Sequence, residues 1–170
     1  MTKCAITGLR DIKYFEENKL KRIKECTLKV IHLLHTKYNV DTFFCGMALG
    51  ADLMAASEIL KYKEAFNKKI EIIPTIPCLT QTKAWREKDK MKYKNILKMS
   101  QTPVIISEKF TNTCMLDRNK YMVDHSDILL GIYDGRQNGG TKYTIDYALK
   151  NKKKIILINT NSCRVYKNFK

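Results

Sequence analysis

Short apolar runs alternate with longer amphipathic segments along this chain, and this pattern leaves few folds open to it. Several runs are apolar almost continuously, such as IEIIPTI at residues 70–76 and DILLGIY at residues 127–133. Continuous rather than alternating apolar character is typical of strands that are covered on both faces. We therefore predict buried strands at residues 3–8, 41–47, 70–76, 103–107, 127–133 and 153–159.

The segments between these runs follow helical spacing. In the first of them, apolar side chains recur along one face from Leu20 to Leu34. Further helices are predicted at residues 51–66, 83–99, 114–125 and 141–151. Alternating strands and helices imply right-handed crossovers and a parallel sheet. The prediction is a single α/β, Rossmann-like three-layer domain at residues 1–160 with a mostly parallel sheet, followed by a polar tail at residues 161–170 that frays.

The charge balance points to an anionic partner. The chain has 32 Lys and Arg against 17 Asp and Glu, a formal net charge of +15. Such an excess attracts polyanions or a phosphate-bearing small ligand. The alternative is that most lysines merely solvate helix faces, so single-stranded nucleic-acid binding is kept as a less favoured alternative.

The cysteine pattern argues against a metal centre. None of the six cysteines forms a CxxC pair or lies near a histidine at zinc-ligand spacing, so we expect no metal and no cofactor. The first residues lack a long apolar stretch, and no run approaches the roughly 20 residues of a membrane span. A cytoplasmic protein without a membrane partner is the expectation.

A first glycine turn, residues 46–52, closes a predicted strand and opens a helix. In a doubly wound sheet the ligand crevice lies beyond the carboxyl ends of the strands. Gly46 and Gly50 allow close backbone approach to a ligand, and the helix start offers free N–H groups to an anion. Ala48, between the two glycines, is also counted among the candidate ligand contacts. The alternative is an ordinary strand–helix turn with Asp52 in the first helical turn.

A second glycine turn, residues 134–141, has the same position relative to a later strand and helix. Gly139, Gly140 and Thr141 form a second candidate anion cradle, with Asp134 just before it. The alternative is a flexible loop in which Thr141 caps the helix.

Other candidate ligand contacts follow the first strand and an aromatic turn. Thr7, Gly8 and Arg10 end the first strand, where Arg10 either pairs with an anion or is a surface arginine. Trp85 is the only tryptophan, and it either stacks on a base or anchors a loop.

Arg118 and Asn119 are polar residues on the predicted helix that leads into a buried strand. Arg118 either reaches the crevice or pairs with Asp117 or Asp124 on the surface. We count both Arg118 and Asn119 among the candidate ligand contacts.

These segments together resemble the SLOG superfamily, and most closely its YpsA-like branch. The resemblance runs from about residue 3 to residue 159 and rests on AITGLR, FFCGMALGADLMAA, the Ile76, Pro77, Gln81 and Trp85 stretch, and RNKYMVDHSDILLGIYDGRQNGGTKYTIDYA. It implies a Rossmann-like sheet with a pocket for nucleotide-related ligands, and it is compatible with a homo-oligomer.

One branch of this superfamily, the LOG-type phosphoribohydrolases, cleaves N-glycosidic bonds of nucleoside monophosphates. Arg118 and the Gly140–Thr141 pair match its pattern, but its catalytic glutamate falls at Thr144. A hydroxyl cannot serve as a carboxylate base. A hydrolase is therefore the alternative function, with Arg118 and either Asp52 or Asp127 as weak catalytic candidates.

A second branch, DprA, binds single-stranded DNA and has a similar glycine turn. Few aromatic residues are placed here for base stacking. The favoured function is binding of a nucleotide or nucleotide-derived, ADP-ribose-like ligand as a sensor or sequestering protein. Glycines of both turns would cradle phosphate, the two arginines would add charge, and Asp52, Trp85 or Asp134 would contact sugar or base.

Overall fold

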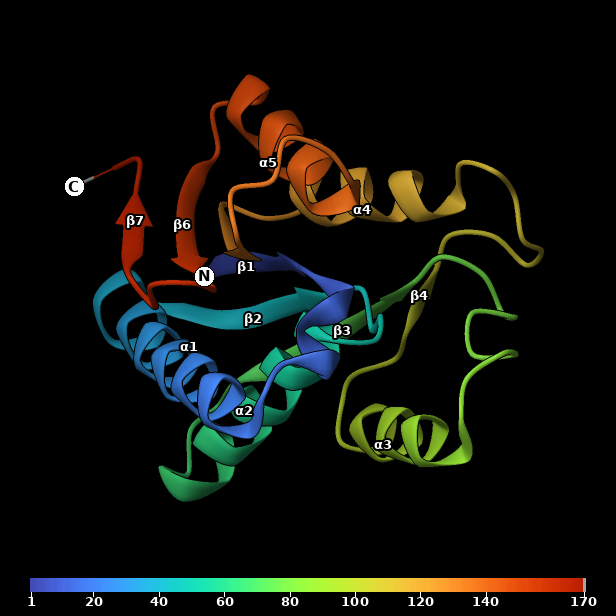
Figure 1. The fold of residues 1–170 in the computed structure, drawn as a ribbon, viewed down its shortest axis with the longest axis horizontal. Coiled ribbons are helices and arrows are strands. Elements are labelled where there is room, and N and C mark those ends of the chain that lie inside the picture. Colours follow the sequence, from blue (N-terminus) through green and yellow to red (C-terminus); the bar gives the residue numbers. More distant parts are fainter. Residues whose placement is uncertain (170) are drawn as a thin grey trace.

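The computed structural model describes residues 1–169 as a seven-stranded sheet flanked by helices (Figure 1). The strand order is β4-β3-β2-β1-β5-β6-β7, and every pairing is parallel except that of β6 with β7. The strands are β1 (Thr2–Gly8), β2 (Val40–Cys45), β3 (Glu71–Ile76), β4 (Val104–Ile105), β5 (Ile128–Tyr133), β6 (Lys154–Asn159) and β7 (Val165–Lys167).

The helices lie in two layers on either side of the sheet. Figure 1 shows α1 and α2 on one face and α4 and α5 on the other, while α3 packs beside α2. The helices are α1 (Glu17–Tyr38), α2 (Ala51–Ala65), α3 (Glu87–Lys98), α4 (Cys114–Asp124) and α5 (Gly140–Lys150), and a short 3-10 helix, η1 (Arg10–Tyr14), follows β1. The predicted three-layer α/β fold is confirmed.

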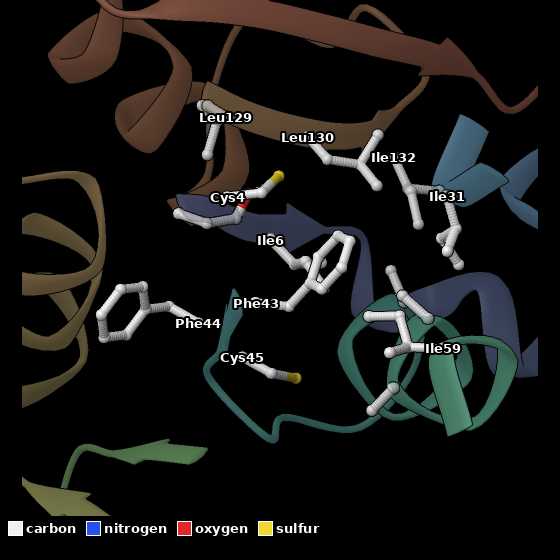
Figure 2. Close-up of a cluster of buried hydrophobic side chains, with 14 of the residues drawn as sticks. Cys4, Ile6, Ile31, Phe43, Phe44, Cys45, Ile59, Leu129, Leu130 and Ile132 are labelled. Atoms are coloured by element: carbon white, nitrogen blue, oxygen red, sulfur yellow. Dashed lines mark hydrogen bonds between the residues drawn. The ribbon is translucent and has the colours of Figure 1, made fainter. Parts of the chain in front are cut away.

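Coverage on both faces explains the continuous apolar runs. All six residues of β5 are buried. In β2, Phe43 lies toward Ile31 and Ile59 of the first helical layer, while Phe44 points the other way (Figure 2). The Phe44 ring lies 6.4 Å from that of Tyr121 on α4. Successive side chains of one strand therefore fill both halves of the core.

The strand order reverses direction between β1 and β5. The chain runs outward from β1 through β2 and β3 to β4, and then returns to place β5 on the other side of β1. Cys4 of β1 thus lies opposite both Phe43 of β2 and Ile128 of β5. A reversal of this kind leaves a crevice at the carboxyl ends of the two strands, where ligands bind in doubly wound sheets.

Two predicted boundaries and the predicted tail differ from the structure. The strand expected at residues 103–107 is only Val104–Ile105, and the helix expected from residue 83 begins at Glu87. Tight turns precede that helix: the N–H of Trp85 donates to the Thr82 carbonyl at 3.0 Å. Fraying of the tail at residues 161–170 is wrong for Val165–Lys167, which pair with β6. The turn between the two strands is fixed because the Asn159 side chain accepts the Asn161 and Ser162 N–H groups.

Within residues 1–169, no helix has the length and apolar character required to cross a membrane.

Candidate functional site

A cavity of about 450 Å³ lies at the carboxyl ends of β1 and β5. Its volume is within the roughly 300–1,000 Å³ that small-molecule sites occupy. Most of the ligand contacts predicted from sequence line it: Thr7, Gly8, Arg10, Ala48, Asp52, Arg118, Asn119, Gly139, Gly140 and Thr141. Gly46, Gly50 and Asp134 lie outside the lining, and so does Trp85.

The first glycine turn is filled by the protein itself. Gly50 has a φ of 88°, and a Cβ there would lie 2.4 Å from the Arg10 carbonyl oxygen. The N–H of Ala51 donates to the Leu9 carbonyl at 3.0 Å, and that of Leu53 donates to the Ala48 carbonyl at 3.2 Å. Backbone carbonyls therefore accept hydrogen bonds from N–H groups that we predicted to be available to an anion.

Arg118 of α4 enters the space beside this turn. Its side chain is 5% exposed, its Nη1 donates to the Gly46 carbonyl, and it lies 3.7 Å from Oδ2 of Asp52. A Cβ on Gly46 would overlap the guanidinium. Gln81 donates to the same Gly46 carbonyl at 3.1 Å. The surface pairing considered for Arg118, with Asp117 or Asp124, is therefore wrong.

Burial controls the charges at the base of the cavity. It raises the pKa of the Asp52 carboxyl, while the nearby Arg118 and the Ala48 N–H act in the opposite direction. An arginine in a protein stays protonated. Within the described residues, Nε of Arg118 has no hydrogen-bond partner, although it is buried. Since a buried, unpaired donor is costly, a ligand oxygen that reached it would be stabilising.

The second glycine turn is open, in contrast to the first. Gly139 and Gly140 are exposed, and a Cβ on either would meet no atom within 4 Å. Among residues 1–169, no protein oxygen accepts the N–H groups of Gly140, Thr141 and Lys142, which begin α5. Free N–H groups at the positive end of a helix dipole are suited to holding an anion, and Gly140 and Thr141 line the cavity wall.

Arg136 joins the rim of the cavity to η1. Its guanidinium donates to both carboxylate oxygens of Asp134, at 3.0 and 2.7 Å, and to Asp11 at 2.8 Å. These hydrogen bonds lower the pKa of the Asp134 carboxyl. Asp134, predicted to contact sugar or base, is thus engaged by Arg136, and Arg136 itself lines the cavity.

Thr144, at the position of the hydrolase glutamate, is fully buried. Its hydroxyl donates to the Gly140 carbonyl at 2.7 Å and accepts from Asn119 Nδ2 at 2.8 Å. Asn119 therefore fixes the first turn of α5 as well as lining the cavity.

Asp127 and Trp85 lie elsewhere. Asp127 precedes β5 and accepts the Lys3 N–H at 2.8 Å, so it is at the opposite end of the sheet from the cavity. Trp85 lines an adjoining pocket of about 140 Å³, with its ring edge-to-face on Tyr93 at 5.6 Å.

Sequence reasoning missed several residues that line the cavity. Asn138 and Arg136 lie in the second glycine turn, where the prediction considered mainly the glycines. Arg136 could have been found because it follows Asp134 by two residues, a spacing that allows the two side chains to pair. The others are Leu9, Asp11, Met115 and Leu116. No three His, Cys, Asp or Glu side chains of the described chain gather where they could hold a metal ion.

A family model described as the YspA SLOG family matches residues 4–162. Among curated relatives, the uncharacterized SPbeta prophage-derived protein YoqJ of Bacillus subtilis (strain 168) is 35% identical over 143 residues. That match covers 76% of this chain and 81% of the relative.

Two solved structures share the fold. DNA processing protein A from Helicobacter pylori, whose structure concerns a single-stranded DNA binding mode, matches with a TM-score of 0.61 and 22% identity. DNA processing protein A from Streptococcus pneumoniae matches with a TM-score of 0.64 and 14% identity. Each match covers 92% of this chain but only 64% and 50% of those longer chains.

Proposed function

This chain belongs to the YspA SLOG family, and from that premise we propose that its cavity binds a nucleotide or nucleotide-derived ligand, as a sensor or sequestering protein. The observation that carries the proposal is the open N-terminus of α5 beside a buried arginine. Both groups favour a phosphate.

The two glycine turns have different tasks in this proposal. Gly140, Thr141 and Lys142 present backbone N–H groups to the phosphate. The first turn instead holds Arg118 against Asp52, so it contributes a fixed guanidinium with an unpaired Nε donor rather than a second backbone cradle. The ligand therefore meets one backbone site and one side-chain site.

Arg10 supplies a further positive charge at the cavity wall. Within residues 1–169, no carboxylate lies within ion-pair distance of it, whereas Arg136 is engaged by two carboxylates. Arg10 is thus the rim arginine that is free to pair with a phosphate, and Arg136 serves to hold the rim.

Hydrolysis of the ligand has less support than binding. The acidic side chains of the lining are Asp11 and Asp52. Asp11 pairs with Arg136, and Asp52 faces Arg118 and the Ala48 N–H. A general base must be free to accept a proton from water. Release of free base from a nucleoside monophosphate at high protein concentration would restore the hydrolase alternative.

Single-stranded nucleic acid is the second candidate ligand, favoured by the net charge of +15 and by the fold shared with DNA processing protein A. This candidate predicts oligonucleotide affinity that falls steeply as salt rises. Affinity that is insensitive to salt between low and moderate concentrations would remove it.

Calorimetry with two variants of equal size and different charge tests the proposal. We expect wild-type protein to bind AMP or ADP-ribose, G140D to bind at least about tenfold more weakly, and G140N to stay within about threefold of wild type. The aspartate places a negative charge where the phosphate would lie, and it meets no atom within 4 Å at its Cβ.

Circular dichroism serves as the control, because an acidic residue in a first helical turn stabilises the helix by about 0.3–1 kcal/mol. G140D should therefore melt no earlier than wild type. Absence of binding to any nucleotide, or equal binding by G140D and wild type, contradicts the proposal.

A further inference from the structure

We propose that the pocket beside Trp85 is a second subsite of the same ligand, built for a flat aromatic base. The inference rests on the proposed function and narrows the ligand class. It assigns a ligand with a sugar phosphate at one end, a base at the other, and a second phosphate between them.

The two pockets are neighbours with a shared wall. Arg10, Ala48 and Met115 line both of them. The wall includes a contact at 3.7 Å between Nη2 of Arg10 and Sδ of Met115. A thioether sulfur is a weak acceptor, and both side chains are long and rotatable. This contact is therefore easily exchanged for a better one.

A phosphate at the junction would provide the better acceptor. Arg10 has no carboxylate partner among the described residues, and an arginine pairs with phosphate through two parallel hydrogen bonds. Rotation of Arg10 toward that phosphate would break its contact with Met115. The two pockets would then form one groove.

The smaller pocket has the chemistry of a base site. Trp85 is half-buried and held edge-to-face by Tyr93, and Leu49 adds an apolar wall. Gln81 donates its Nε2 to the Gly46 carbonyl, which fixes the amide and leaves Oε1 without a partner among the described residues. A planar base would stack on the indole, and its exocyclic amine would donate to Gln81 Oε1.

Intrinsic fluorescence reports directly on this pocket, because Trp85 is the only tryptophan. The probes are ADP-ribose, which spans both pockets, and ribose 5-phosphate, which fills only the larger one. We expect ADP-ribose to change the Trp85 emission and ribose 5-phosphate to leave it constant, although calorimetry detects binding of both.

Variants of Trp85 then measure how much the indole ring contributes to ligand affinity. We expect W85L to lower the ratio of ADP-ribose affinity to ribose 5-phosphate affinity about tenfold, and W85F to restore most of it. F110L, which removes an exposed aromatic ring outside both pockets, should leave the ratio unchanged. The wild-type fluorescence comparison decides the question if W85L does not fold.

Failure of this inference is distinct from failure of the proposed function. If both probes bind with equal affinity and neither alters Trp85 emission, the second subsite is wrong while phosphate binding stands. If calorimetry detects neither probe, the proposed function fails and the second subsite fails with it.

Discussion

The two glycine turns look alike in sequence but differ in structure. Each follows a central strand and opens a helix. In the first, the Leu9 and Ala48 carbonyls take helix N–H groups, and the Arg118 guanidinium packs against Gly46. In the second, the N–H groups that begin α5 have no protein acceptor within residues 1–169.

The difference shows that a glycine-rich helix start can bind an anion only when the rest of the fold leaves its N–H groups unpaired and accessible. The first turn depends on packing: its glycines make room for an arginine and for the backbone of η1. In the second turn, a Cβ on Gly139 or Gly140 would meet no atom within 4 Å, so this part of the turn is free to meet a ligand. The first should therefore govern stability and the second should govern binding.

The free energy of unfolding should change most when Arg118, which packs against the first turn from α4, is removed, and less when Arg136 of the second turn is removed. R118M leaves Asp52 buried without its counter-charge, so the free energy of unfolding should fall by about 3–5 kcal/mol. R136M removes two ion pairs at the surface, with Asp134 and Asp11, and should cost about 1 kcal/mol or less. Urea unfolding at pH 7 measures the free energy of unfolding of both variants. Equal losses would contradict the different roles of the two turns.

A smaller effect on the free energy of unfolding should distinguish Gly50 of the first turn from Gly140 of the second. G50A forces a side chain into the left-handed region and against the Arg10 backbone, and we expect it to cost about 2–3 kcal/mol. G140A meets no atom within 4 Å and has ordinary backbone, so it should change the free energy of unfolding by about 0.5 kcal/mol or less. Thermal melting of the pair tests this, and a stable G50A would contradict the packing role of the first turn.

The smallest effect is in the titration of one carboxylate from each turn. Burial raises the pKa of Asp52 above 3.8, and Arg136 lowers that of Asp134 below 3.8. The contribution of Asp52 to stability is therefore present at low pH and lost as the pH rises from about 3.8 through its folded pKa. That of Asp134 is present above about pH 3.8 and lost as the pH falls through its folded pKa.

Carboxyl NMR titration should show Asp52 and Asp134 shifted in opposite directions. D134N should cost up to about 1 kcal/mol at pH 7 and nothing at pH 2. A cost of D134N that is constant with pH, or an Asp52 that titrates below 3.8, would show that the two turns have similar electrostatic environments.

The fold was predictable because its signals are local. Continuous apolar strands such as residues 127–133 and helical spacing such as that from Leu20 to Leu34 identified the layers. Elements with weak local patterns were missed: η1 is five residues long and β7 is three. Both depend on contacts with distant residues, as β7 does on its pairing with β6.

The sequence predicted most of the residues that line the candidate site but not what each of them contacts. The switch in strand order gathered most of the expected residues at one cavity. Sequence could not show that Arg118 would reach Gly46, 72 positions away, and so occupy the first turn. Asp127 could have been excluded from the sequence, because it begins the predicted strand at residues 127–133 and therefore lies at the end of the sheet away from the crevice.

The position of β1 between β2 and β5 has a consequence for how the cavity forms. Its pairing with β5 joins residues more than a hundred positions apart, and such distant contacts form slowly because a long loop must close first. The cavity therefore forms only after β1 and β5, with the segments that follow them, have been brought together. A ligand bound there stabilises the complete fold by mass action, so the thermal shift of the intact protein is a direct screen for the ligand.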